Sequence, residues 1–171
     1  MKLLVVVDMQ TDFVDGALGT QEAVSIVPAV VDRVARAIQE GWDLIFTQDT
    51  HTQDYMNTQE GKNLPVPHCI KGSEGWAIIP QLREFALGRP CVEKPTFGSL
   101  ALAELVSRCE YEEIELIGLC TDICVISNAM LLKAALPEVP ICVDSACCAG
   151  VTPASHANAL EAMKLCQITV K

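Results

Sequence analysis

The pattern of apolar and polar residues predicts a chain in which short strands alternate with helices. Residues 3–7 are consecutive apolar residues without polar alternation, which is typical of a strand covered on both faces. Comparable apolar runs predict further strands at 44–47, 91–93, 114–119, 141–144 and 168–170. Apolar residues at helical spacing predict helices at 26–39, from 99 to about 108, at 122–135 and at 152–165.

Several residue types mark the ends of these helices. Gly41 follows the first helical stripe and Pro137 follows the third, and neither residue type continues a helix well. Ser99 is expected to cap the second helix through its side chain. Thr152 is expected to cap the fourth, with Pro153 in its first turn. The helix boundaries therefore agree with the apolar pattern.

The alternation of strands and helices predicts an α/β fold. We expect a single domain, residues 1–171, built as a three-layer αβα sandwich around a mainly parallel six-stranded sheet. In such sheets, ligands bind outside the carboxyl ends of the strands. A polar stretch from about 48 to 75 has no clear period, and loops of this length inside compact domains are usually functional. Functional residues are therefore expected in this stretch and directly after the strands.

The composition narrows the partners that the chain can bind. Half of the 171 residues are apolar, and the formal net charge is −10. No basic run is present that could neutralise phosphates, which argues against nucleic-acid and anionic-membrane binding. No stretch approaches the roughly 20 apolar residues of a membrane span, and the N-terminal apolar run is too short for a signal peptide. We therefore expect a cytoplasmic protein, and the apolar content is compatible with a homo-oligomer.

The chain contains nine cysteines, but their arrangement favours neither a disulfide framework nor a zinc finger. Their number is odd, the expected compartment is reducing and no C-x-x-C pair occurs. Cys91, Cys142 and Cys166 lie in apolar runs, where a free cysteine packs as a small hydrophobic residue. Cys147 and Cys148 follow a predicted strand, and we assign them no function.

Three residues that follow predicted strands could form a catalytic group. Cys124 lies in GLCTDICV, where Thr121 or Asp122 would cap a helix and place the thiol in its first turn. The amides of that turn favour thiolate and could stabilise an oxyanion. Asp8 follows the first apolar run, and a carboxylate partly removed from water is a better base when a charge such as Lys94 balances it. The alternatives are a packing cysteine and a structural ion pair.

A second group of residues could bind a metal. Asp49 and His51 are two positions apart, so their side chains point to the same side of an extended segment. Glu60 and His68 follow in the same polar stretch. Two imidazoles with one or two carboxylates suit zinc, iron or manganese, with room for another ligand. The alternative is a set of ordinary hydrogen bonds on the surface of a loop.

Other catalytic classes lack support in the sequence. No G-x-S-x-G, G-x-G-x-x-G or Walker motif occurs, which argues against a serine hydrolase and the usual nucleotide-binding folds. His156 is predicted in the first turn of a helix and exposed to solvent. No histidine is therefore placed as the partner of Cys124.

Taken together, the motifs resemble those of the isochorismatase-like cysteine hydrolases, and among them most closely the nicotinamidases. The resemblance covers nearly the whole chain, through VVVDMQTDFVDGALG, TQDTH, PHCIKGSEGW, EKPTFGS and GLCTDICV. It implies a catalytic triad of Asp8, Lys94 and Cys124. Asp8 would take the thiol proton and Cys124 would attack the amide carbonyl, while Lys94 balances the charge. Ammonia would then leave, and water would hydrolyse the resulting thioester.

The resemblance also assigns further residues. It implies a cis peptide bond between Leu119 and Cys120, which would aim the backbone amides of Cys120 and Cys124 at the oxyanion. It implies a divalent metal, in the first place zinc and otherwise iron or manganese, with the ligands Asp49, His51 and His68 and, as a fourth, Glu60. It implies aromatic residues around a flat ring, for which the candidates are Phe13, Trp76 and Phe97. The alternative for these three residues is packing in the core.

The implied reaction is hydrolysis of nicotinamide to nicotinate and ammonia, in NAD salvage, with the metal holding the pyridine nitrogen. A first alternative keeps the triad and changes the substrate to another small amide, ureide or carbamoyl compound, as in relatives that lack the metal. A second alternative is a thiol redox or binding protein without hydrolytic turnover. Cys124 argues against vinyl-ether hydrolysis, because isochorismatase itself lacks the cysteine nucleophile. The expected partner is therefore a small-molecule amide.

Overall fold

A six-stranded sheet forms the centre of the structure, and every pair of neighbouring strands in it is parallel. The structure is a computed structural model that describes the whole chain, Met1–Lys171. The strands are β1 (Lys2–Val7), β2 (Asp43–Asp49), β3 (Cys91–Lys94), β4 (Glu113–Leu119), β5 (Ile141–Ala149) and β6 (Thr169–Val170). Their order across the sheet is β3-β2-β1-β4-β5-β6. The predicted α/β fold with a parallel six-stranded sheet is confirmed.

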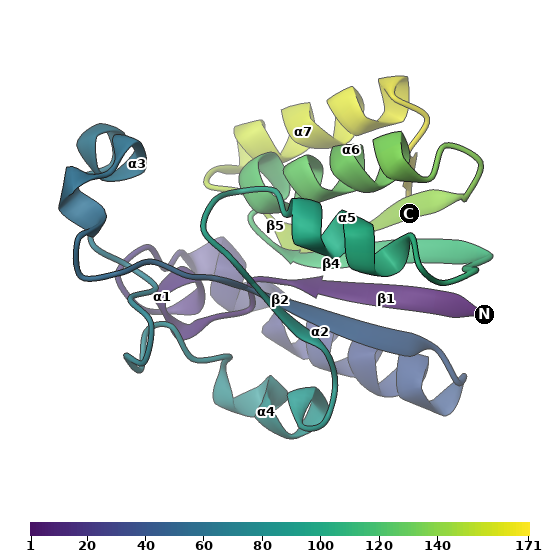
Figure 1. Cartoon of the computed structure of the whole chain (residues 1–171), viewed down its shortest axis with the longest axis horizontal. Helices are drawn as coiled ribbons and strands as arrows, with labels where there is room; N and C mark the ends of the chain where they lie inside the picture. The colour runs from purple at the N-terminus through teal and green to yellow at the C-terminus, as the bar shows by residue number, and fades with distance from the viewer.

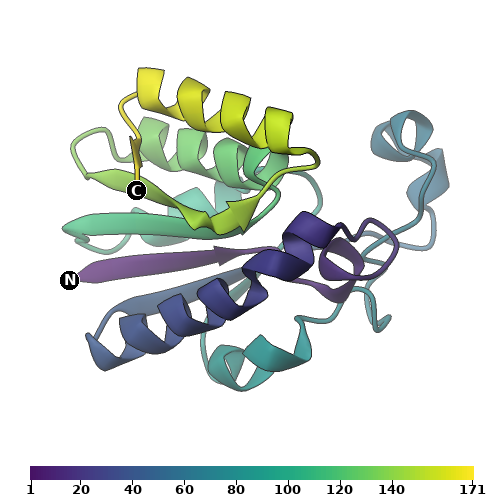
Figure 2. The same ribbon diagram turned by 180° about the vertical axis from the view of Figure 1, so that it is seen from behind.

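Helices cover both faces of the sheet, which gives the three predicted layers (Figure 1). One layer contains α2 (Gln21–Gln39) and α4 (Pro80–Ala86), and Figure 2 shows α2 crossing the face of the sheet. The other layer contains α5 (Leu100–Val106), α6 (Ile126–Ala135) and α7 (Pro153–Leu165). None of the helices combines the length and the apolar character needed to cross a membrane.

The side chains of β1 alternate between two hydrophobic clusters, one on each face of the sheet. The odd-numbered residues of 3–7 pack with α5, α6 and α7, whereas the even-numbered residues pack with α2 and α4. All of them are fully buried, and burial of a Val or Leu side chain stabilises a fold by about 1.5–3 kcal/mol. The strand is thus anchored on both sides, which fixes the position of Asp8 at its end.

Several helices differ from the sequence prediction; the helix predicted at 122–135, for example, is the π-helix η2 (Thr121–Val125) up to Val125 and an α-helix, α6, from Ile126. α2 begins at Gln21, before the predicted start at 26, and the hydroxyl of Thr20 caps it by accepting a hydrogen bond from the Ala23 amide at 3.0 Å. Polar residues dominate this first part of α2, so the apolar stripe begins later than the helix. The sequence analysis does not predict α4, because its apolar face, formed by Leu82, Phe85 and Ala86, belongs to a helix of only seven residues and is too short to repeat.

β5 extends to Ala149, beyond its predicted end at 144. The continuation begins with Asp144 and Ser145, which do not resemble part of a buried strand. The pairing of β5 with β4 also shifts in register between Leu116 and Gly118. The second half of β5 is therefore a product of sheet packing that the local pattern does not show.

Gly118 lets β4 pass close beside β1 immediately before the chain reaches the site. Its φ is +118°, and a Cβ atom there would lie 2.1 Å from the carbonyl oxygen of Val7. A side chain at this position would collide with the backbone of β1, and the conformation itself disfavours other residue types.

The polar stretch 48–75 contains regular structure that the sequence pattern does not predict. It includes η1 (Tyr55–Asn57) and α3 (Gln59–Asn63), which extend away from the sheet in Figure 1. An isolated bridge pairs His51 with Ile70 and brings the two ends of this excursion together. Two further short elements flank the sheet: α1 (Thr11–Val14) and the π-helix η2 (Thr121–Val125).

Candidate active site

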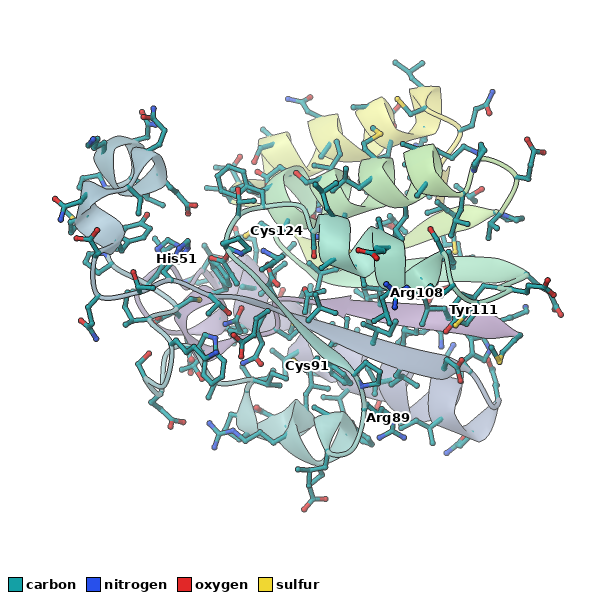
Figure 3. All side chains as sticks on the ribbon, in the orientation of Figure 1. His51, Arg89, Cys91, Arg108, Tyr111 and Cys124 are labelled. Atoms are coloured by element: carbon teal, nitrogen blue, oxygen red, sulfur yellow. The ribbon has the colours of Figure 1, made fainter.

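Four chemically active side chains meet at the carboxyl ends of the neighbouring strands β3, β2, β1 and β4. Asp8 follows β1, Asp49 ends β2 and Lys94 ends β3. Cys124 lies in η2, directly after β4. Figure 3 shows Cys124 and His51 at the same end of the molecule. This is the edge at which ligands bind in open parallel sheets.

The ammonium group of Lys94 lies at the centre of these side chains. Its Nζ is 2.6 Å from Asp8 Oδ2, 3.3 Å from Asp49 Oδ1 and 3.4 Å from Cys124 Sγ. It also donates a hydrogen bond to the Thr96 carbonyl at 3.1 Å. Lys94 and Asp8 are fully buried, and Asp49 and Cys124 are nearly so. A charge at this depth requires compensation, which the two carboxylates supply.

Thr47 of β2 fixes the carboxylate of Asp8. Its hydroxyl donates to Asp8 Oδ1 at 2.6 Å, and the amide of Asp8 donates to the Thr47 hydroxyl at 3.2 Å. Asp8 has φ +47°, a left-handed conformation that Asp adopts more readily than most residues. With Oδ1 held by Thr47, Oδ2 faces Lys94. The sequence gives no signal for Thr47, because threonine is common in strands.

Burial and neighbouring charges determine the protonation states. Burial raises the pKa of Asp8 above its usual value, although Lys94 opposes the shift. Burial opposes the charged form of Lys94, but the anionic neighbours together outweigh it and raise the pKa of Lys94. Burial, reinforced by the charge of Asp8, raises the pKa of the Cys124 thiol well above its usual value. The resting form is therefore a thiol, which corrects the expectation that the helix terminus favours thiolate.

The turn before Cys124 is held by backbone hydrogen bonds. The peptide bond between Leu119 and Cys120 is cis. The carbonyl oxygen of Cys120 accepts hydrogen bonds from the amides of Ile123 and Val125, at 3.1 and 3.0 Å. These bonds close a compact turn that carries Cys124 on its inner side, next to Lys94.

Neither Thr121 nor Asp122 caps η2 through its side chain, so that prediction is wrong. The Thr121 hydroxyl lies 2.7 Å from Nδ1 of His156, and the Asp122 carboxylate accepts a hydrogen bond from the Val151 amide at 3.2 Å. His156 is partly buried rather than exposed, because the start of α7 packs against η2. Both side chains serve contacts between distant segments, which a local pattern does not reveal.

Asn128 of α6 connects the nucleophile turn to the segment that carries Lys94. The side-chain nitrogen Nδ2 of Asn128 donates to the carbonyl oxygens of Cys124 and Phe97, at 2.8 and 3.2 Å. Its side-chain oxygen accepts from the Ser99 amide at 3.0 Å. Asn128 is fully buried, and these bonds use most of its hydrogen-bonding capacity. Sequence reasoning missed this residue because a helical asparagine gives no distinct signal.

The four predicted metal ligands converge next to Lys94. Nε2 of His51 lies 2.9 Å from Asp49 Oδ2 and 3.5 Å from Glu60 Oε1. Nε2 of His68 lies 3.4 Å from the same oxygen of Asp49 and 3.6 Å from the same oxygen of Glu60. The four ligand atoms lie within 4.8 Å of one another. Asp49 belongs to both groups, since Oδ1 faces Lys94 and Oδ2 faces the histidines.

Backbone pairing brings these ligands together. The His51 amide donates to the Cys69 carbonyl, and the Lys71 amide donates to the His51 carbonyl, both at 2.9 Å. The Cys69 amide in turn donates to the carboxylate of Asp12 in α1 at 2.8 Å. The segment that carries His68 therefore runs beside the end of β2, where Asp49 and His51 lie.

The donor chemistry of the cluster fits a divalent metal. Nδ1 of His68 lies 2.8 Å from the Val66 carbonyl. Because a carbonyl only accepts, Nδ1 carries the proton and Nε2 presents its lone pair to the cluster. Although burial favours the neutral ring, the carboxylates of Asp49 and Glu60 raise the pKa of His51 to about 9. These carboxylates thus favour a positive charge at the cluster, and a bound metal would take the place of the His51 proton. Two imidazole nitrogens and two carboxylate oxygens form a ligand set that zinc accepts.

Gln10 is fully buried between β1 and the metal-ligand cluster, and it positions Asp49. The side-chain nitrogen Nε2 of Gln10 donates to the carbonyl oxygens of Asp49 and Trp76, at 2.9 and 2.8 Å. Its side-chain oxygen accepts from the Asp49 amide at 2.7 Å. Sequence reasoning missed its role although it stands in the opening motif, because its partners lie on distant segments.

Replacement of Gln10 with Leu is expected to lower the free energy of unfolding by about 2–4 kcal/mol. The substitution removes the Gln10 side-chain bonds to the amide and carbonyl of Asp49, whereas the carbonyl of Trp76 keeps its bond from the Gln48 side chain at 3.0 Å. Denaturant unfolding measures the loss. Gln53→Leu, at an exposed position, is the matched control and is expected to change stability by less than about 0.5 kcal/mol. Equal stability of the Gln10 variant and the wild type would contradict the bonding described here.

A cavity of about 50 Å³ lies between the nucleophile and the metal-ligand cluster. The residues that line it are Phe13, Leu18, Asp49, Glu60, Leu64, His68, Phe97, Cys120, Ile123 and Cys124. The charged and polar side chains in this list belong to the metal-ligand cluster, and the two thiols belong to the nucleophile turn. The other lining residues are apolar. The apolar wall with a few polar groups is typical of a ligand site, and the small volume restricts it to a small molecule.

Two of the three predicted aromatic residues line this cavity. Phe13 is nearly buried, with its ring centroid 5.5 Å from that of His68. Phe97 is 43% exposed and lies on the nucleophile side. Trp76 is not among the residues that line the cavity, and its indole nitrogen donates to the Thr50 hydroxyl at 2.9 Å. The geometry therefore does not support the prediction that Trp76 contacts the substrate.

Comparison with known proteins identifies the family of this chain. The family model described as the isochorismatase domain matches residues 2–171. The chain is also 30% identical over 141 residues to PncA of Bacillus subtilis, an uncharacterized isochorismatase family protein, with 75% of this chain and 76% of that protein aligned. The chain therefore belongs to the isochorismatase family of hydrolases, as the motifs indicate.

Two solved structures share the fold over nearly their whole length. One is the nicotinamidase/pyrazinamidase PncA from Bacillus subtilis, with 27% identity, a TM-score of 0.84, and 99% of this chain and 98% of that chain covered. The other is the pyrazinamidase of Pyrococcus horikoshii in complex with zinc, with 23% identity, a TM-score of 0.85 and the same coverage. These likenesses agree with the α/β architecture described above.

Proposed function

We propose that this protein hydrolyses nicotinamide to nicotinate and ammonia through a thioester on Cys124. The observation that carries the proposal is the contact of Lys94 with both Asp8 and Cys124, beside a cluster of four potential metal ligands. The nucleophile and the cluster face the same small cavity, as a reaction on one end of a ring compound requires. The activity named for the Bacillus subtilis structure supports the same substrate class.

Asp8 is the proton acceptor in the first step. Its raised pKa makes it a stronger base than a carboxylate in water. It takes the thiol proton as Cys124 attacks the amide carbonyl, and the backbone amides of Cys120 and Cys124 stabilise the oxyanion. Asp8 then gives the proton to the leaving amino group, which departs as ammonia and leaves the acyl group on Cys124.

Water completes the cycle at the same residues. Asp8, again unprotonated, removes a proton from a water molecule that attacks the thioester, and then returns the proton to the sulfur of Cys124. Lys94 stays protonated because its anionic neighbours raise its pKa. It therefore balances the negative charge of Asp8 and of the developing thiolate while the proton moves.

We infer that a divalent metal, in the first place zinc, is held by Asp49, His51, Glu60 and His68. A metal held there would supply a Lewis-acid site at the end of the cavity opposite Cys124, suited to the ring nitrogen of the substrate. The zinc complex of the Pyrococcus horikoshii pyrazinamidase supports this choice. Phe13 and Phe97 are positioned to contact the ring while Cys124 faces the carboxamide.

Zinc is expected to raise the melting temperature of the chelated protein. A ligand at 1,000 times its Kd that binds the folded state alone adds about 4.1 kcal/mol, or about 8–16 °C for a domain of this size. His68→Asn is expected to lose most of this increase, whereas His156→Asn, outside the cluster, is expected to keep it. Thermal unfolding followed by circular dichroism measures both. An unchanged melting temperature of the wild type at saturating zinc would contradict the metal site.

Ammonia release from nicotinamide tests the proposed function. We expect the purified protein to release ammonia, to lose this activity on chelation and to regain it when zinc is returned. Cys124→Ala serves as the blank. Zinc-loaded protein that releases no ammonia would contradict nicotinamide as the substrate, and a panel of small amides and ureides would then identify the compound that the triad accepts.

A further inference from the structure

His156 is the one histidine that the proposed reaction does not use, and it contacts the nucleophile turn from a distant segment. It lies near the start of α7, and its Nδ1 is 2.7 Å from the hydroxyl oxygen of Thr121. Thr121 is fully buried and directly follows Cys120 in the chain. The contact therefore joins α7 to the turn that carries the nucleophile.

The support of His156 is itself fixed. Thr152 caps α7 in a capping box, which orders the first turn of the helix. Gly150 allows this turn to approach closely, since a Cβ atom there would lie 2.9 Å from the Cβ of His156. The Val151 amide donates to both carboxylate oxygens of Asp122 at 3.2 Å, which forms a second bond between this loop and η2.

The position of Thr121 matters because it lies between the two amides that the proposed reaction uses. Cys120 precedes it, and Cys124 follows one turn later. No side chain caps η2, so the hydroxyl of Thr121 is free to bond outside its own turn. A shift of Thr121 would move the Cys120 carbonyl, which accepts the hydrogen bonds that close the turn.

We propose that His156 is a positioning residue, which holds Cys124 and the oxyanion-binding amides in line through the Thr121 hydroxyl. It does not line the cavity and does not touch the substrate. It acts on the geometry of the turn, and a small displacement of a nucleophile removes a large part of the rate. The inference rests on the proposed function only in taking Cys124 as the nucleophile.

The first test follows a reaction of Cys124 that requires no known substrate. Iodoacetamide, a small carboxamide that alkylates thiols, is added to the full chain, and modification of Cys124 is followed by peptide mass spectrometry. His156→Leu removes the ring nitrogen and is expected to slow this alkylation about tenfold. His156→Asn places an amide near the position of Nδ1 and is expected to recover the rate to within about threefold of the wild type. The buried Cys142 and Cys148 must stay unmodified, which shows that each variant is folded.

Two further variants separate positioning from packing. Asn158→Ala, exposed on the same helix, is the matched control and is expected to react like the wild type. Thr121→Val keeps the shape of the side chain but removes the hydroxyl, and is expected to match His156→Leu. The double variant Thr121→Val, His156→Leu should react no more slowly than either single variant, because both substitutions remove the same hydrogen bond. An unchanged rate in His156→Leu, or additive effects in the double variant, would overturn the proposal.

Turnover provides a second readout. With an amide substrate, His156→Leu is expected to lower kcat about tenfold and to change KM less than about twofold, because the residues that bind the substrate are untouched. A change confined to KM would overturn the positioning role. Absence of ammonia release from nicotinamide by the wild type would contradict the proposed substrate, whereas the alkylation rates would still decide the role of His156.

Discussion

Cys124→Ala is expected to lower kcat for amide hydrolysis by at least about 10⁴-fold while the protein stays folded. The thiol of Cys124 is the group that forms the covalent intermediate, and of the two thiols that line the cavity it is the one that contacts Lys94. The side chain is small and nearly buried, so its truncation is expected to change stability by only about 1 kcal/mol. Ammonia release measures the activity, and circular dichroism establishes the fold.

Cys148→Ala is the matched control for this substitution. Cys148 is also buried in the same hydrophobic cluster as Cys124, but it does not line the cavity. The control is therefore expected to keep activity within about twofold of the wild type. Retention of more than about 1% of wild-type activity by Cys124→Ala would show that another group carries the reaction.

Lys94→Met is expected to lower both stability and activity strongly. The apolar side chain fills a similar volume but leaves the carboxylates of Asp8 and Asp49 buried without their common cation. Removal of one partner of a buried ion pair costs about 3–5 kcal/mol, which denaturant unfolding at pH 7 measures. Activity is expected to fall at least about 10³-fold, because Asp8 without its cation holds its proton and cannot accept the one from the thiol.

The stability deficit of Lys94→Met is expected to shrink as the pH falls. Lys94 is the main charge that lowers the pKa of Asp8, so its removal raises this pKa further. A carboxyl group whose pKa is higher in the folded than in the unfolded state costs stability above its unfolded pKa, about 3.9 for Asp, and this cost disappears as the pH falls to that value. The double variant Asp8→Asn, Lys94→Met is expected to regain part of the stability without regaining activity. A deficit that is constant from pH 7 to low pH would contradict the buried ion pair.

The sequence predicts the fold where apolar patterning and burial coincide. Residues 3–7 are buried on both faces, so an uninterrupted apolar run identifies β1. The prediction fails where burial depends on tertiary packing. The second half of β5 becomes a strand after a register shift beside Gly118. The helix α4 packs on the core through Leu82, Phe85 and Ala86, but its seven residues are too few to show a repeated pattern. Periodicity reports the average environment of a segment, and these segments have mixed environments.

The candidate site is predictable where a reactive residue follows a strand. Asp8, Lys94 and Cys124 each follow an apolar run, and a parallel sheet brings the ends of its strands together. The residues that orient them are different. Thr47 contacts Asp8 across 39 positions, and Asn128 contacts Ser99 across 29. A buried polar side chain is recognised only when its partner is known, and the raised pKa of Cys124 likewise depends on burial that only the folded chain creates.

The most direct test of the central claim, that Cys124 forms a thioester with the amide substrate, is interception of the acyl group by hydroxylamine. Hydroxylamine competes with water for a thioester and converts a nicotinoyl group into nicotinohydroxamate. With nicotinamide and the zinc-loaded wild type, we predict nicotinohydroxamate that rises with hydroxylamine concentration as nicotinate falls, and none with Cys124→Ala. Nicotinate as the only product at every hydroxylamine concentration, with ammonia still released, would contradict a thioester on Cys124.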